Sequence, residues 1–146
     1  MRVKDQDLLL KDLCGRLPYG VKCIANSDGY AGVISSIESQ YGVATFDDGR
    51  QEEICDIKPY LFPLSSMTEE SAKELYEMYG FSDEETWIAN YIKANNVYGL
   101  KLFSEIGFLV EKDLDILLNW LHKYQFDYRG LIEKGLAIDA TGLNIY

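Results

Sequence analysis

The sequence predicts an α+β fold: an N-terminal helix, a small curled antiparallel β-meander of SH3-like size, and a C-terminal helical lobe with a short terminal strand or arm. Three observations predict this order: leucines at helical spacing near the start, short β-like runs separated by turn residues, and a long helical stripe of apolar residues in the second half. The chain has 146 residues, 47% of them hydrophobic, which is enough for a core. We expect one compact unit with two lobes, residues 1–64 and 65–146.

The N-terminal helix is predicted from the segment "DQDLLLKDLCGRL". Leu9, Leu10, Leu13 and Leu17 recur at helical spacing, and the first aspartates are of the type that caps a helix. The "PYG" that follows contains Pro18, which continues a helix poorly. We therefore expect a short amphipathic helix with its leucine stripe against the core.

A β-meander is predicted from four short runs, "VKCIAN", "AGVISSI", "VATF" and "QEEICDI". The turns between them contain Asp28-Gly29 and Asp48-Gly49, pairs that tolerate the positive φ angles of tight hairpins, so the strands should pair antiparallel. A flat sheet of so few short strands would expose its edges. We therefore expect a curled sheet or a small barrel that packs against a helix.

An extended connector is expected after the meander, because Pro59 and Pro63 bracket apolar residues in "DIKPYLFPLSSM". It should lie on the surface, anchor through Tyr60, Leu61 and Phe62, and mark the boundary between the lobes. Capping boxes that begin at Ser66 and Ser82 then predict two short helices.

The rest of the second lobe is predicted from one strong stripe. Apolar residues at helical spacing over residues 110–124 predict its main helix. Residues 96–110 fit neither the helical nor the strand period. The ending allows a capped turn from Asp127, a stop at Gly135 and a short strand "LAI".

Acidic residues dominate the charge of the chain. The 24 aspartates and glutamates outnumber the 14 lysines and arginines, which gives a net charge of -10. Such a protein repels phosphate backbones and anionic lipid surfaces. We therefore expect no direct binding to nucleic acid or membrane, and a protein as partner or a second copy of the chain in a homo-oligomer.

The cysteines and the hydropathy favour a cytoplasmic protein. Cys14, Cys23 and Cys55 are widely spaced and form no C-x-x-C pair, so neither a disulfide framework nor a zinc site is predicted. They are typical of small buried residues in a reducing compartment. No apolar run approaches the ~18 residues of a membrane helix, and the leucine run near the start is too short for a signal peptide.

Few residues predict chemistry. His122 is the only histidine, and a surface or half-buried position on a helix explains it better than a metal site or a catalytic triad. The hairpin "DDGRQEE" gathers Asp47, Asp48, Glu52 and Glu53 and could attract a hard cation, but its spacing does not match a calcium loop, and turn chemistry explains it as well. Phosphate-binding glycine motifs do not occur. We expect no catalytic residue, no metal and no cofactor.

The candidate binding residues are Tyr60, Phe62, Asp127, Tyr128 and Arg129. An exposed arginine beside a carboxylate can bind a phosphate or a partner's acidic group, and Tyr128 can add a stacking face. The structural alternative is that Asp127 caps the turn after it while Arg129 pairs with an acidic neighbour. We favour this alternative, because one carboxylate and one guanidinium lack the convergent groups that catalysis needs. If the fold has a binding groove, it is expected where Tyr60 and Phe62 meet Tyr128 and Arg129, since aromatics and arginine dominate binding hot spots.

Three segments, "DLCGRLPYGVK", "KPYLFPLSSMTEE" and "FDYRGLIEKGLAIDA", resemble a family of small uncharacterised proteins from gut bacteria and their phages or mobile elements. The resemblance covers both ends and the centre of the chain and departs mainly in residues 81–111. It implies an accessory gene product that binds or modulates another molecule, and it carries over no catalytic residue.

Three function classes are open from the sequence. The first is a non-enzymatic protein-interaction or modulatory module of a bacterial or phage system. The second is an acidic mimic of nucleic acid that inhibits a DNA-binding protein, which the net charge of -10 favours. The third is a small hydrolase that uses carboxylates alone, which needs two acids that converge in a cleft.

Overall fold

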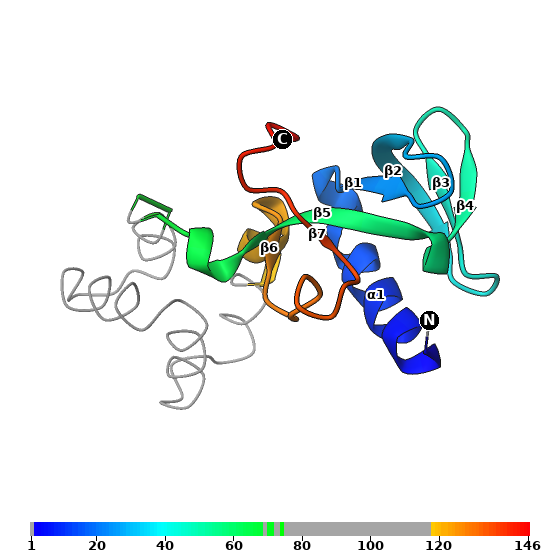
Figure 1. The fold of residues 1–146 in the computed structure, drawn as a ribbon, viewed down its shortest axis with the longest axis horizontal. Helices are drawn as coiled ribbons and strands as arrows, with labels where there is room; N and C mark the ends of the chain where they lie inside the picture. Colours follow the sequence, from blue (N-terminus) through cyan, green and yellow to red (C-terminus); the bar gives the residue numbers. More distant parts are fainter. Residues whose placement is uncertain (1, 69, 72–73, 75–117) are drawn as a thin grey trace. The chain divides into compact units, whose positions relative to one another are not determined.

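The computed structural model describes residues 2–68, 70–71, 74 and 118–146 (Figure 1). The helix predicted from Ser82, the stretch 96–110 and most of the main helix of the second lobe lie outside these residues. The chain divides into two compact units, Met1–Phe62 with Arg129–Tyr146, and Pro63–Tyr128. The predicted α+β class is confirmed, with an N-terminal helix followed by a mainly antiparallel sheet.

The N-terminal helix α1 spans Val3–Arg16 and confirms the predicted leucine stripe. Leu9 and Leu13 are fully buried. The predicted aspartate cap is wrong: the N-cap is Arg2, without a side-chain hydrogen bond, and Asp5 lies within the first turn, where its charge favours the helix dipole. A 3-10 helix, Leu17–Tyr19, follows, and Gly20 ends it in the left-handed region at φ 68°.

The sheet of the first unit is an antiparallel meander in the order β4-β3-β2-β1-β5 (Figure 1). Its strands are β1 Lys22–Ala25, β2 Ala31–Glu38, β3 Val43–Phe46, β4 Gln51–Glu53 and β5 Ile57–Pro63. The first half of β2 pairs with β1 and the second half with β3, with a shift of register between Ile34 and Ser36. This division of one strand between two neighbours curls the sheet, as predicted. In the two predicted turns, Gly29 and Gly49 have φ angles of 74° and 91°.

The predicted connector is extended and anchored through Tyr60 and Leu61, which are buried, but its expected place on the surface is wrong, because residues 57–63 form the strand β5. The predicted fourth strand is correspondingly divided into β4, a 3-10 helix at Ile54–Asp56 and the start of β5. Pro59 lies opposite Cys23. The amide of Asn26 donates to the carbonyl of Asp56, so these two opposite residues form a hydrogen-bonded pair. Hydrogen-bonded and non-hydrogen-bonded pairs alternate along an antiparallel ladder, which makes Cys23 and Pro59 a non-hydrogen-bonded pair. Pro59 therefore needs no amide hydrogen for pairing with β1.

The core of the first unit lies between α1, the sheet and the returning segment 131–140. It joins side chains from all three: Leu9, Leu13, Val21, Cys23, Ile34, Ala44, Phe46, Ile54, Ile57, Leu61, Leu131, Leu136 and Ala137. The strand β7, Ile138–Asp139, pairs parallel with β5 and confirms the predicted short terminal strand. This pairing holds the returning segment against the meander.

The second unit is described in part. Leu64–Ser66 form a 3-10 helix, and Thr68 Oγ1 accepts a hydrogen bond from the Ser71 amide, so the cap of the helix that follows is Thr68 rather than the predicted Ser66. Residues 118–123 are helical, and β6 spans Phe126–Asp127. The ring of the buried Trp120 stacks on Phe126 at 5.5 Å between centroids. In the described parts of the chain, no helix combines the length and the apolar character needed to span a bilayer.

Candidate functional site

Arg50 organises the tip of the meander. Its Nη2 atom lies 2.8 Å from both carboxylate oxygens of Asp28 and 2.8 Å from Glu52 Oε1. Its guanidinium lies 4.6 Å from the centroid of the Tyr30 ring, and the Tyr30 hydroxyl donates to Asp48 Oδ2 at 2.6 Å. We call these five residues the Arg50 network. It ties the β1–β2 turn, which carries Asp28, to the β3–β4 turn, which carries Asp48.

The network favours the charged form of its aspartates. The hydrogen bond from Arg50 lowers the pKa of Asp28, and the hydrogen bond from Tyr30 lowers the pKa of Asp48. The same Asp48 carboxylate raises the pKa of the Tyr30 hydroxyl, because it accepts that proton in a hydrogen bond. At neutral pH the turns therefore present fixed negative charge.

The surrounding segment is acidic over its whole length. We call residues 26–56 the acidic meander. They carry seven acidic side chains and one basic side chain, Arg50. Their net charge is -6, and that of the whole chain is -10. The four acidic residues of this segment outside the Arg50 network are all exposed: Glu38, Asp47, Glu53 and Asp56. None of the four takes part in an ion pair with another described residue. The only cation of this segment is therefore already engaged, and most of its carboxylates face solvent.

A second arginine–aspartate pair is completely buried. Arg16 donates to Asp12 through Nε at 2.7 Å and Nη2 at 3.1 Å, and both side chains have 0% exposure. Asp12 Oδ1 also lies 3.3 Å from Nε of Arg129, whose side chain is 30% exposed. Arg129 thus contacts an acidic neighbour, Asp12, as expected if the role of this arginine is structural.

His122, Asp127 and Tyr128 belong to the second unit. The expected surface or half-buried position of His122 is wrong: the residue is buried, and its Nε2 lies 2.7 Å from the Tyr128 hydroxyl. The turn after the helical segment brings the Tyr128 ring to 5.5 Å from the imidazole between centroids, and this contact contributes to the burial. Asp127 is also buried and lies in β6. The hydroxyl of Tyr128 is engaged by the histidine.

Tyr60 and Phe62 meet a residue that sequence reasoning did not single out, Tyr146. The Tyr146 hydroxyl accepts a hydrogen bond from the Lys22 amide at 2.9 Å and donates to the Tyr60 carbonyl at 2.8 Å. The rings of Phe62 and Tyr146 lie 5.9 Å apart, and Lys22 Nζ lies 5.7 Å from the Tyr146 ring and 2.6 Å from the Ile145 carbonyl. Tyr60 contributes its backbone here, because its side chain is buried in the sheet.

The strand register explains this geometry. Hydrogen-bonded pairs of β1 and β5 fall at every second position, starting from Asn26 opposite Asp56. By this alternation, Lys22 and Tyr60 would form the hydrogen-bonded pair after Cys23 and Pro59. The pairing instead stops at Cys23 and Pro59. The phenol of Tyr146 stands between the Lys22 amide and the Tyr60 carbonyl, in place of one direct rung of the ladder. We call this opening between β1 and β5 the strand fork.

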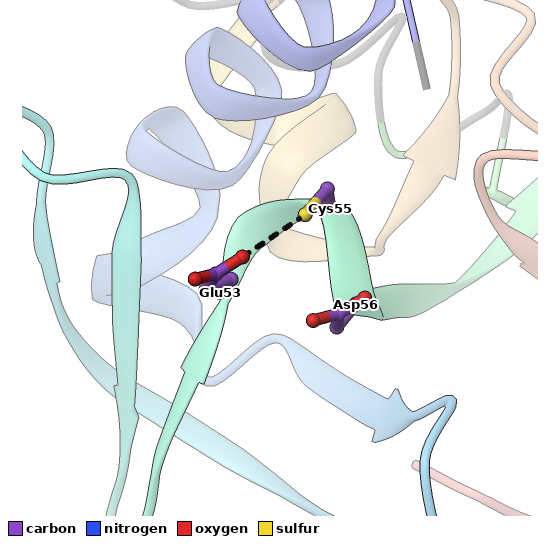
Figure 2. Close-up of side chains that lie close together, drawn as sticks. All are labelled: Glu53, Cys55 and Asp56. Carbon is purple, nitrogen blue, oxygen red and sulfur yellow. Dashed lines mark hydrogen bonds between the residues drawn. The ribbon is translucent and has the colours of Figure 1, made fainter.

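One group of side chains has donor atoms at metal-binding distance. The ligand atoms of Glu53, Cys55 and Asp56 lie within 4.8 Å of one another (Figure 2). However, Cys55 Sγ donates to Glu53 Oε2 at 3.5 Å, and burial, followed by this hydrogen bond, raises the pKa of the thiol. In this group the Cys55 thiol and the Glu53 carboxylate are thus hydrogen-bond partners of each other. Glu53 and Asp56 are exposed, so the two carboxylates lie on the surface and not in a cleft of the described residues.

No protein-family model, curated protein or solved structure matches the chain. The site residues therefore depend on geometry alone. Two of the missed features had signals in the sequence. Asp12 and Arg16 lie on the leucine face at helical spacing from Leu9, and Arg50 is the only cation between Lys22 and Lys58. Tyr146 had no local signal, because its partners lie 124 and 86 positions away along the chain.

Proposed function

We propose that the protein is a non-enzymatic protein-interaction module that binds a basic surface of a partner through its acidic meander, as a cytoplasmic accessory factor of a bacterial or phage system. The observation that carries the proposal is the net charge of -6 in residues 26–56. Complementary charge speeds encounter and selects among partners. A partner's lysines and arginines find carboxylates there that no cation of the chain's described part neutralises.

The Arg50 network supports this function by ordering the surface. Arg50 and Tyr30 tie two turns together through hydrogen bonds of 2.6–2.8 Å. Turns ordered before binding lose less conformational entropy when a partner docks. Arg50 therefore offsets one negative charge of the acidic meander and fixes the carboxylates of Asp28 and Glu52.

A second candidate is favoured by the same charge pattern. An acidic segment with a single, engaged cation offers negative charge of the kind that a DNA-binding cleft accepts. In this function the partner is a nucleic-acid-binding protein and the acidic meander occupies its cleft. The two candidates differ in whether duplex DNA competes for the captured partner.

The test is affinity capture from lysate of the host cell with three baits of the full chain. The first is the wild type, and the second carries Asp47→Asn with Glu53→Gln in the acidic meander. The third carries Asp7→Asn with Glu133→Gln, which changes the net charge equally at exposed sites elsewhere. We expect partners that the wild type and the third bait retain and the second loses. Equal retention by all three would refute the proposal. Release of the partner by added duplex DNA would assign the mimic function.

A further inference from the structure

The strand fork recognises one side chain by three features at once. The Lys22 amide requires an acceptor, the Tyr60 carbonyl requires a donor, and the Phe62 ring and the Lys22 ammonium flank an aromatic face. A phenol hydroxyl both accepts and donates. Phenylalanine has the ring without the hydroxyl, and serine has the hydroxyl without the ring. The fork is therefore built to select tyrosine.

Tyr146, the residue that fills the fork, is hydrogen-bonded there through its hydroxyl group. In the segment 141–146 only Ile145 is half-buried, while Leu143 and Tyr146 are 49% and 47% exposed. Asn144 has a φ of 53°, in the left-handed region that L-residues other than glycine seldom adopt. The hydrogen bonds that join the segment to β1 and β5 converge on Lys22 and Tyr60. About half of the surface of Leu143 and of Tyr146 therefore stays in solvent while the segment occupies the fork.

We propose that the strand fork is a binding site for a tyrosine side chain, which Tyr146 occupies within the chain and which a tyrosine-bearing peptide of a partner protein occupies when residues 143–146 are displaced. The site uses none of the residues of the acidic meander. A ligand attached to the chain has a millimolar effective concentration, so it masks the site from free peptides and yields to a partner bound elsewhere on the molecule. Binding at the fork thus follows engagement of a second surface.

The experiment uses the full chain with Tyr146→Ala, in which the fork is vacant, and compares two probes by amide NMR. N-acetyltyrosinamide is the probe, and N-acetylphenylalaninamide, which lacks the hydroxyl, is the matched control. We expect the first probe to shift the Lys22 amide resonance saturably, with an affinity about tenfold or more above that of the second, since two hydrogen bonds are at stake. The wild type should bind the first probe more weakly than the variant does.

Three outcomes would overturn the proposal. Equal binding of the two probes would show a site for any aromatic ring. Absence of binding would show that the vacated fork is not a binding site for a tyrosine side chain. A wild-type dimer that is lost with Tyr146→Ala would show that the second occupant is another copy of the chain rather than a partner protein.

A conservative variant covers the case in which Tyr146→Ala does not fold. Tyr146→Phe keeps the ring and removes the hydroxyl, so hydrogen exchange at the Lys22 amide should accelerate about tenfold as its acceptor is lost. Unchanged exchange at Lys22, with exchange elsewhere as in the wild type, would show that the fork does not depend on the hydroxyl and would overturn the proposal.

Discussion

Two arginine–aspartate pairs in one unit have similar hydrogen-bond geometry and different surroundings. Arg16 binds Asp12 at 2.7 Å with both side chains at 0% exposure, whereas Arg50 binds Asp28 at 2.8 Å with exposures of 28% and 53%. Water can solvate each partner of the exposed pair when the other is lost, whereas the buried pair is shielded from water. The difference teaches that distance alone does not assign a role: the buried pair holds the fold, and the exposed pair shapes a surface.

The largest expected effect comes from breaking the buried pair. Asp12→Ala leaves the Arg16 guanidinium without its carboxylate in the core, and we expect it to lower the free energy of unfolding by about 3–5 kcal/mol. Urea denaturation followed by circular dichroism measures the loss. Asp7→Ala, at an exposed position of the same helix, is the matched control and should cost less than about 1 kcal/mol. Equal losses in the two variants would contradict the distinction drawn from burial.

Replacing the whole buried pair sharpens the same comparison. Asp12→Leu with Arg16→Met removes both charges and keeps apolar volume, so we expect it to recover most of the stability that Asp12→Ala loses. Of the two arginines that contact Asp12, Arg129 is the more exposed, with 30% of its side chain in solvent. If the double variant is as unstable as Asp12→Ala, the ion pair itself stabilises the core. The loss in Asp12→Ala would then not come from leaving Arg16 without Asp12.

The exposed pair should appear in the acid limb of the stability curve. Because the pKa of Asp28 is lowered in the folded chain, its contribution is complete at neutral pH and is lost as the pH falls below about 4. Arg50→Gln removes the largest cause of that shift, so the variant should lose less stability than the wild type between about pH 5 and about pH 2. Lys58→Gln, with the same change of charge, is the control. Parallel acid limbs in the wild type and Arg50→Gln would contradict the assignment.

A smaller effect on stability is expected at alkaline pH, from the hydroxyl of Tyr146. Burial of its hydroxyl raises its pKa, so the folded chain holds this proton more tightly than the unfolded chain. Its contribution is complete below about pH 10 and is lost as the pH rises above that value. Denaturation at increasing pH should show a shallower alkaline decline for Tyr146→Phe than for the wild type. The same decline in both proteins would place the hydroxyl in water.

The elements with a local signal could be predicted from the sequence. The leucine face of α1 and the glycine turns of the meander depend on neighbours a few residues away, and both are confirmed. The strand β5 could not, because one of the prolines that suggested a connector, Pro59, is tolerated in the strand through its register with β1. The same holds for Tyr146, whose partners Lys22 and Tyr60 are remote in the chain. Of the predicted site residues, Tyr60 and Phe62 meet at the strand fork, and Arg129 contacts Asp12.

The smallest expected effect on stability belongs to the acidic meander. Asp47→Asn with Glu53→Gln should change the free energy of unfolding by no more than about 0.5 kcal/mol, because both side chains are exposed and bear no ion pair in the described part of the chain. Urea denaturation checks this value. A larger loss would mean that these carboxylates hold the fold and are not free for a partner.

The most direct test of the proposed function is the dissociation constant of the captured partner, measured by calorimetry at rising salt concentration for the wild type and for Asp47→Asn with Glu53→Gln. We expect the affinity of the wild type to fall steeply with salt, and the variant to bind more weakly at low salt with a shallower fall, because screening acts on the charges that bind. An affinity that neither salt nor the variant changes would contradict binding through the acidic meander.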